Sequence, residues 1–209
     1  MKGKLGKKSF WTKQFYLWHW VSSAICLASM LLFAITGITL NHAGEISSSP
    51  KKIERSGTLP DDLLPLLAPA DSEEPEFKKI LPRPVRDWIK EEFSVQLKAR
   101  PYEWSEFDIY IDLPIPGGDA WMSLDRETGE VLYEKTTRGI ISYANDLHKG
   151  RNTGSEWSWF LDVFSVASII FCLTGLVLLW VHAKRRPSTW PLVAAGFLLP
   201  ILIIIFFVH

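Results

Sequence analysis

Three long apolar stretches dominate the pattern of hydrophobic and polar positions along this 209-residue chain. Residues 18–40 and 190–208 contain no Asp, Glu, Lys or Arg, and residues 157–181 contain only one such residue, Asp162. A helix needs about 20 apolar residues to cross a hydrocarbon core of about 30 Å. The stretches hold 23, 19 and 25 residues, respectively. The pattern therefore predicts three transmembrane helices rather than the buried helices of a soluble bundle.

The region between the first two stretches has shorter patterns. Apolar positions at helical spacing predict a helix over residues 84–93, with Pro84 suited to its first turn. Residues 107–113 alternate apolar and polar positions, as in a half-buried strand. Residues 44–60 contain Ser, Gly and Pro and are predicted to be a loop. Further predictions are short helices at 61–67 and 73–80, strands at 95–99, 120–124 and 130–135, and turns at 114–118 and 125–129.

These elements predict a membrane α-helical protein with an inserted domain. Three transmembrane helices are expected, with a small α+β domain, one helix on an antiparallel sheet, between the first and second helices. The expected segments are a basic N-terminus (1–15), the first transmembrane helix (16–42), a linker with the α+β domain (43–146), an outer-face segment with the second transmembrane helix (147–182), a loop (183–189) and the third transmembrane helix (190–209).

Basic residues flanking the apolar stretches predict the orientation in the membrane, because Lys and Arg concentrate in short cytoplasmic flanks. We therefore expect the N-terminus and residues 183–189 in the cytoplasm. Residues 43–146 and the C-terminus are then expected outside the cytoplasm. The basic residues concerned are Lys2, Lys4, Lys7, Lys8 and Lys13 before the first stretch, and Lys184, Arg185 and Arg186 between the second and third.

Charge and cysteine content narrow the function classes. The 23 basic and 23 acidic residues balance to a net charge of zero, so nucleic acid is not an expected partner. The two cysteines, Cys26 and Cys172, both lie inside apolar stretches. A disulfide framework for the α+β domain is therefore excluded.

Four of the five histidines lie where the predicted helices meet the membrane surface. His19 and His182 belong to the cytoplasmic end, and His42 and His148 to the outer end. Ionisable residues at such depths mark functional sites, and facing imidazoles are what a haem iron needs as axial ligands. We therefore expect His19 and His182 to bind one haem b iron, and His42 and His148 a second. The alternative is that each ring only reaches the polar headgroups.

Helix geometry adds detail to this hypothesis. His42 follows His19 by 23 residues, which is about 35 Å and a rotation of about 140° in an ideal helix. The two pairs then lie near opposite surfaces, and the first helix must bend or unwind after Leu40. The second nitrogen of each ring is expected to donate to a backbone carbonyl or carboxylate, with Glu45 and Asp146 as candidate acceptors. We predict no catalytic residue.

Several motifs resemble those of one family. The run from Met122 to Leu132, MSLDRETGEVL, resembles the strand–turn–strand signature of PepSY domains. The flanking helices resemble those of PepSY-associated transmembrane proteins, and each carries a Thr-Gly pair at a matching place. The elements concerned are Trp18-His19-Trp20, Ile35-Thr36-Gly37-Ile38, Leu147-His148-Lys149-Gly150, Gly154-Ser155-Glu156-Trp157, Leu173-Thr174-Gly175-Leu176 and Leu179-Trp180.

This resemblance implies a PepSY-like domain within residues 43–146, b-type haem in the membrane helices and outward electron transfer. Some relatives reduce iron–siderophore complexes in the periplasm, and others have no established activity. The larger members have four or more spans, whereas three are predicted here. Whether this chain alone is an oxidoreductase therefore stays open.

The resulting hypothesis is a di-haem b-type electron-transfer protein with membrane lipid as its surroundings. Quinol or a cytoplasmic flavoprotein is the expected donor. A ferric-siderophore, another metal complex or a redox protein is the expected periplasmic acceptor, and a homodimer is compatible with three helices. The alternative is a non-redox adaptor or inhibitor, a PepSY module anchored in the membrane. A proton-coupled transporter fits less well, because Asp162 is the sole acid within the stretches.

Overall fold

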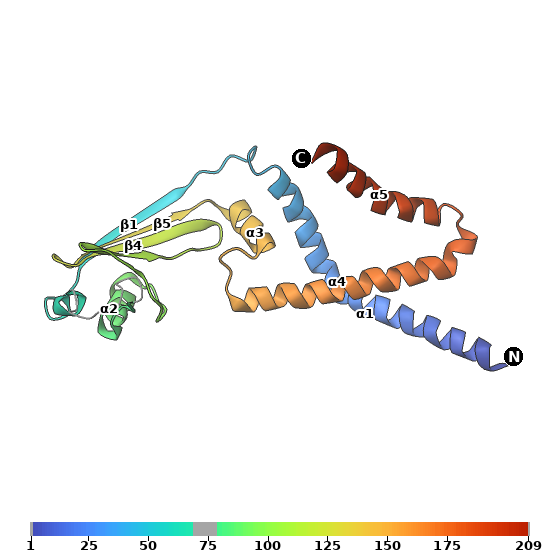
Figure 1. The fold of residues 1–209 in the computed structure, drawn as a ribbon, viewed down its shortest axis with the longest axis horizontal. Coiled ribbons are helices and arrows are strands. Elements are labelled where there is room, and N and C mark those ends of the chain that lie inside the picture. Colours follow the sequence, from blue (N-terminus) through green and yellow to red (C-terminus); the bar gives the residue numbers. More distant parts are fainter. Residues whose placement is uncertain (1, 69–78, 209) are drawn as a thin grey trace. The chain divides into compact units, whose positions relative to one another are not determined.

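The computed structural model describes the backbone of residues 2–68 and 79–208, with side chains from residue 10 onward (Figure 1). The described part forms two compact units, which are treated separately: Met1–Leu32 with Trp159–His209, and Phe33–Ser158. In chain order, five strands lie between the long helices α1 and α4. The long helices are α1 (Lys2–Asn41), α4 (Ser155–His182) and α5 (Thr189–Phe207).

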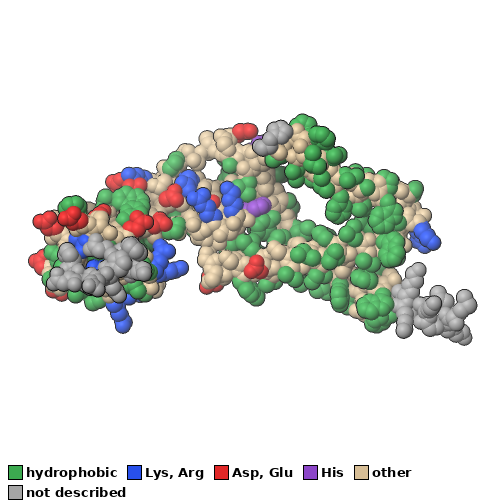
Figure 2. Space-filling model, in the orientation of Figure 1, with side chains coloured by type: hydrophobic (Ala, Val, Ile, Leu, Met, Phe, Trp, Pro, Cys, Tyr) green, Lys and Arg blue, Asp and Glu red, His purple; other side chains and the backbone are tan. Residues whose placement is uncertain are grey.

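These three helices confirm the predicted apolar elements. Three segments are long and apolar enough to cross a membrane: Phe10–Asn41 in α1, Ser155–Arg185 (α4 with the 3₁₀ turn Ala183–Arg185 that follows it) and Thr189–Phe207, which is α5. Their apolar side chains point outward; Leu27 in α1 is 69% exposed and Ile204 in α5 is 59% exposed. Figure 2 shows such side chains in green along the helical segments. Outward apolar side chains need a hydrocarbon solvent, so this is a membrane protein.

The strands form one antiparallel sheet in the order β1-β5-β4-β3-β2. The alternating stretch predicted at residues 107–113 is β3, where Ile109 and Ile111 are fully buried. The strands are β1 (Lys51–Thr58), β2 (Glu103–Trp104), β3 (Asp108–Asp112), β4 (Gly118–Asp125) and β5 (Glu130–Thr137).

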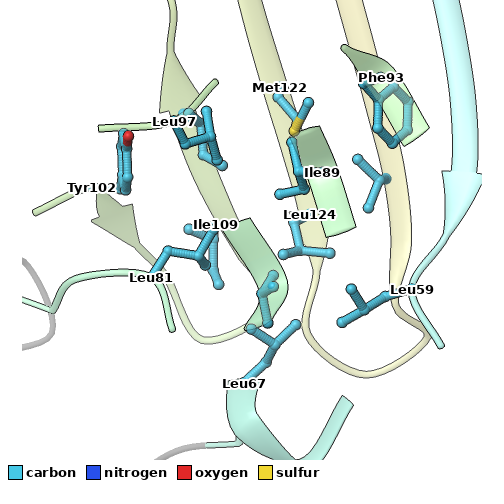
Figure 3. Packing of buried hydrophobic residues seen from close by; sticks show 13 residues of the cluster. Leu59, Leu67, Leu81, Ile89, Phe93, Leu97, Tyr102, Ile109, Met122 and Leu124 are labelled. Carbon is cyan, nitrogen blue, oxygen red and sulfur yellow. The ribbon is translucent and has the colours of Figure 1, made fainter. Parts of the chain in front are cut away.

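One helix, α2 (Arg83–Phe93), packs on this sheet, as predicted. Val85, Ile89 and Phe93 recur every four residues and are buried, because this spacing places them on one helix face. They join inward side chains of β3, β4 and β5 in a single core (Figure 3). Each fully buried Val or Ile contributes about 1.5–3 kcal/mol relative to an exposed one.

The β4–β5 hairpin closes with the turn that the Asp-x-x-Thr-Gly run predicts. The Asp125 carboxylate accepts hydrogen bonds from the backbone N–H groups of Thr128 (2.7 Å) and Glu127 (2.9 Å). The bonds from Thr128 and then Glu127 hold the pKa of Asp125 below its usual value. Gly129 adopts φ +71°, a conformation that glycine takes without steric cost.

Two predictions in this region are wrong. Residues 51–58 form β1 rather than a loop, although nearly every side chain on that strand is exposed. Backbone pairing with β5 makes it a strand, so no apolar alternation reveals it. Residues 95–99 are irregular instead of a strand, because Ser94 takes a left-handed φ of 58° after α2. Only β2 then pairs with β3 at this edge.

The remaining differences concern short helices. The helix predicted at residues 61–67 is one 3₁₀ turn, η1 (Leu64–Leu67). Residues 73–78 of the helix predicted at 73–80 lie outside the described residues, and Ile80 makes an isolated bridge with Pro101. Helix α3 (Ile140–Lys149) was not predicted. It buries Asn145 and Asp146 while Ile140 is 78% exposed, which is the reverse of the usual amphipathic pattern.

Candidate functional site

His19 lies on α1 against the Thr174-Gly175 pair of α4. Its Nδ1 atom is 3.1 Å from Thr174 Oγ1 and 3.2 Å from the Phe171 carbonyl oxygen. Its ring stacks on the Phe171 ring at a centroid distance of 4.6 Å and an angle of 16°. A Cβ atom at Gly175 would lie 3.3 Å from His19 Cε1. The glycine therefore lets the imidazole approach α4 closely.

His182 lies one to two turns beyond Gly175 at the end of α4. Its Nδ1 donates to the Leu178 carbonyl oxygen at 2.7 Å. Its Nε2 lies 3.0 Å from the Tyr16 hydroxyl, and the two rings meet edge to face. Tyr16 is one turn before His19 on α1, so both histidines of the predicted cytoplasmic-side pair contact the neighbouring helix.

Both rings also line one cavity of about 570 Å³. This volume lies within the range of about 300–1,000 Å³ that is typical of ligand pockets. The walls combine apolar side chains, the side-chain-free Gly175 and two guanidinium groups. The lining residues are His19, Gly175, Leu178, Leu179, His182, Arg185, Arg186 and Thr189. We call this space the His19–His182 cavity.

His148, on the last turn of α3, lies against the other Thr-Gly pair. Its Nδ1 is 2.6 Å from Thr36 Oγ1, and its ring meets the Phe33 ring edge to face at 4.8 Å. A Cβ atom at Gly37 would lie 3.8 Å from His148 Cε1. Each Thr-Gly pair thus contacts one histidine from another helix. The sequence showed the two matching pairs but did not show that a histidine contacts each of them.

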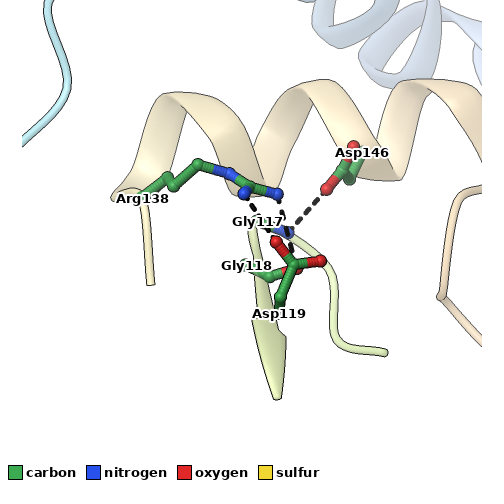
Figure 4. Close-up of polar contacts among 5 residues, drawn as sticks. All are labelled: Gly117, Gly118, Asp119, Arg138 and Asp146. Atoms are coloured by element: carbon green, nitrogen blue, oxygen red, sulfur yellow. Dashed lines mark hydrogen bonds and ion pairs between the residues drawn. The ribbon is translucent and has the colours of Figure 1, made fainter. Parts of the chain in front are cut away.

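His42 has different surroundings. Helix α1 ends at Asn41, as expected for a helix that unwinds after Leu40, and His42 lies in the following turn. Its Nδ1 is 3.2 Å from the carboxylate of Glu45, one of the two candidate acceptors named from the sequence, and its side chain is 49% exposed. The prediction for Asp146 is wrong: this buried carboxylate accepts a hydrogen bond from the Gly117 N–H at 2.8 Å (Figure 4).

The hydrogen bonds determine which ring nitrogen carries the proton. The Thr36 hydroxyl donates to the Phe33 carbonyl, and the Thr174 hydroxyl donates to the Ile170 carbonyl. The Thr174 oxygen therefore accepts from Nδ1 of His19, whose other neighbour, the Phe171 carbonyl oxygen, is an acceptor as well. Nδ1 of His182 and of His42 also faces an acceptor, a carbonyl and a carboxylate, respectively.

Nδ1 of His19, His42 and His182 thus faces a carbonyl or carboxylate oxygen, which favours the Nδ1–H tautomer with the Nε2 lone pair available as a base or metal ligand. The partner of His148 Nδ1 is the Thr36 hydroxyl, which can donate or accept. Nε2 of His182 uses this lone pair to accept from the Tyr16 hydroxyl. Sequence reasoning predicted the histidines and the general kind of acceptor. It did not identify Thr36, Thr174 or Tyr16, because a residue 112 to 166 positions away leaves no local signal.

The described side chains were also compared with the ligand sets of protein metal sites. Within residues 2–68 and 79–208, no group of three or more His, Cys, Asp or Glu side chains is arranged to hold a metal ion. Structural zinc sites need about four protein ligands. A porphyrin iron needs only two axial ligands from the protein.

The long apolar helices, the antiparallel sheet and the motif positions together define a PepSY-associated transmembrane protein. The sequence profile of the family described as Putative PepSY_TM-like matches residues 10–209. The chain belongs to this family, which confirms the resemblance seen in its motifs. No curated protein matches the chain, and no solved structure matches it.

Proposed function

We propose that this chain is a membrane electron-transfer protein that binds haem b between His19 and His182, at the cytoplasmic side of a bacterial inner membrane. The observation that carries the proposal is that both rings, on different helices, line the same cavity. The sheet region of residues 43–146 then forms an extracytoplasmic PepSY-like domain. Quinol or a cytoplasmic flavoprotein is the proposed donor, and a periplasmic metal complex or redox protein is the proposed acceptor.

The residues around the His19–His182 cavity suit a porphyrin. Gly175 adds no side chain to the cavity wall, and Leu178 and Leu179 supply apolar contacts. Arg185 and Arg186 also line the cavity, and guanidinium groups pair with carboxylates such as the two propionates of haem. The donor set, two imidazoles with basic and apolar walls, therefore matches the chemistry of haem b.

When bound, haem supplies one-electron chemistry, with a potential set by its axial ligands and their surroundings. The chain's own groups position those ligands. Thr174 and the Phe171 carbonyl hold His19, and the Leu178 carbonyl holds His182. Such acceptors fix ring orientation and raise ligand basicity. The Tyr16 hydroxyl must release Nε2 of His182 before that nitrogen can bind iron.

His148 and His42, the outer pair, each bond to a neighbouring side chain. His148 contacts Thr36 and His42 contacts Glu45. A cavity of about 370 Å³ in the same unit is lined by neither ring. The proposed function therefore requires only the haem between His19 and His182. The number of haems bound per chain tests whether the second haem predicted from the sequence is also present.

The test is haem content, measured by the pyridine haemochrome of full-length protein purified from haem-replete cells. We expect about one haem per chain, a sharp α band after dithionite reduction, and loss of that haem in His19→Ala and in His182→Ala. His42→Ala is the matched control and keeps the haem. A colourless wild-type preparation would favour the non-redox adaptor. Full haem content in both His19→Ala and His182→Ala would exclude this ligand pair.

A further inference from the structure

Helix α3 exposes apolar side chains outside the histidine site. Ile140 is 78% exposed, Ile141 is 41% exposed and Tyr143 is 42% exposed. All three lie in the first half of the helix, whereas the buried Asn145 and Asp146 lie in its second half. The start of α3 therefore presents apolar side chains to its surroundings, whereas the second half of the helix buries polar ones.

The second half of α3 is attached to the ends of two candidate membrane helices. Thr39, near the end of α1, bonds to Asn145 at 2.6 Å. Thr36 bonds to His148, also at 2.6 Å. On the first turn of α4, Trp157 Nε1 donates to the Leu147 carbonyl at 2.9 Å. Because the ends of membrane helices lie at the lipid–water interface, these contacts place α3 at interfacial depth.

The sheet holds the opposite side of α3. Asp146 accepts from the Gly117 N–H, and Arg138, just before the helix, pairs with Asp119 at 2.7 Å (Figure 4). Gly117 packs so closely on the helix that a Cβ atom there would lie 2.6 Å from Tyr143 Cα. These contacts fix the orientation of α3. The side chains of Ile140 and Ile141 therefore stay exposed and cannot turn toward the core of the unit.

A cavity of about 370 Å³ opens at the start of α3. The polar residues that line it are Ser47, Ser48, Ser49, Arg138, Ser142 and Asn145. The apolar residues that line it include Ile46 and the same Ile140 and Ile141. Arg138 gives one N–H to Asp119 and a longer bond to the Gly118 carbonyl. A guanidinium has five N–H donors, so others are available to a phosphate oxygen.

We propose that this cavity binds a phospholipid at the membrane surface. In this proposal Arg138 and the serine hydroxyls donate hydrogen bonds to the phosphodiester group, and the acyl chains lie along Ile140 and Ile141. A soluble anion would use the polar residues and leave both isoleucines in water. Lipid satisfies the polar and the apolar residues at once, and it is the molecule present wherever α1 and α4 leave the membrane. The site is independent of the proposed haem.

The first experiment is native mass spectrometry of the full chain in detergent, titrated with phosphatidylglycerol. We expect Arg138→Gln to weaken lipid binding about tenfold, as loss of a charge-assisted hydrogen bond does. Asp119→Asn is the matched control, because it removes the same ion pair but keeps the arginine, and it should retain the lipid. Equal retention by both variants overturns the proposal. Displacement of the lipid by millimolar inorganic phosphate overturns it as well.

A second experiment does not depend on Arg138. Ile140→Cys and Phe107→Cys are spin-labelled on a Cys26→Ala, Cys172→Ala background in lipid nanodiscs. Both positions are exposed apolar residues of the same unit, at 78% and 70%, but Phe107 precedes β3 on the sheet. We expect the label at 140 to be accessible to oxygen and shielded from a water-soluble nickel complex, and the label at 107 to behave oppositely. Equal nickel accessibility at both positions overturns the proposal.

Discussion

Single hydroxyl groups control the candidate ligands at the residue scale. Thr36 and Thr174 are 5% and 3% exposed, and each is within hydrogen-bond distance of its own helix backbone and of a histidine Nδ1. At Thr174 the hydroxyl donates to the Ile170 carbonyl, so its oxygen accepts from Nδ1–H of His19. The neighbouring glycine then allows the ring to lie flat against the helix.

Replacing Thr174 by Val should therefore weaken haem binding about tenfold, because outer acceptors of this kind typically contribute a factor of about 10–100. Thr174→Ser keeps the acceptor and should restore binding and the reduction potential. Haem transfer to apomyoglobin and a redox titration measure the two effects. Thr36→Val, at the other Thr-Gly pair, should leave this haem unchanged. Wild-type affinity in Thr174→Val would contradict the positioning role.

The close packing of α3 depends on Gly117. It has φ +71°, and an added Cβ would lie 2.6 Å from Tyr143 Cα, so both backbone strain and overlap oppose a side chain. We expect Gly117→Ala to destabilise the fold by about 2 kcal/mol or more, measured by denaturant unfolding of the full chain. Gly44→Ala, where nothing lies within 4 Å, should be nearly neutral. Equal stability of the two variants would show that α3 can shift without cost.

At the scale of elements, the sheet and α2 form because local patterns and long-range pairing agree. The β4–β5 hairpin has a closing turn with its own hydrogen bonds, and α2 presents one buried face. Edge strand β1 is different. It relies on its pairing with β5 and on Lys52, which contacts Glu134 across the strands at 3.0 Å.

The hairpin turn should respond to acid. The pKa of Asp125 is lowered in the folded chain, mainly by its bonds from Thr128. Its contribution to stability is therefore fully present above its unfolded pKa of about 4 and is lost as pH falls through the lower folded value. Melting curves of wild type and Asp125→Asn should differ by a constant amount above about pH 5 and converge in more acidic solution. A difference that does not change with pH would exclude this role for the carboxylate.

At the scale of the whole molecule, three apolar helices show a membrane protein, and the basic flanks predict how it is inserted. Most of the apolar surface of these helices is exposed; the most apolar segment of α5 has no buried residue. Lipid or another copy of the chain must cover it. These helices therefore need the membrane in order to fold, because exposing their apolar side chains to water would be unfavourable.

Cysteine labelling tests the predicted orientation. On the cysteine-free background, Glu106→Cys near β3 should react with a membrane-impermeant maleimide in intact spheroplasts. Ser188→Cys, between α4 and α5, should react only after the membrane is permeabilised. Both residues are exposed, so accessibility reports the side of the membrane rather than burial. The reverse pattern would show that the basic flanks do not set the orientation.

The amino-acid sequence by itself determined the elements whose signal is local: the three apolar helices, α2 with its four-residue spacing, and the β4–β5 hairpin with its Gly129 turn. Tertiary structure alone decided β1, α3, the threonines that hold His19 and His148, and the cavity shared by His19 and His182. The physical reason is range. Periodicity and turn chemistry are written in neighbouring residues, whereas strand pairing and histidine partners join positions that only the folded chain brings together.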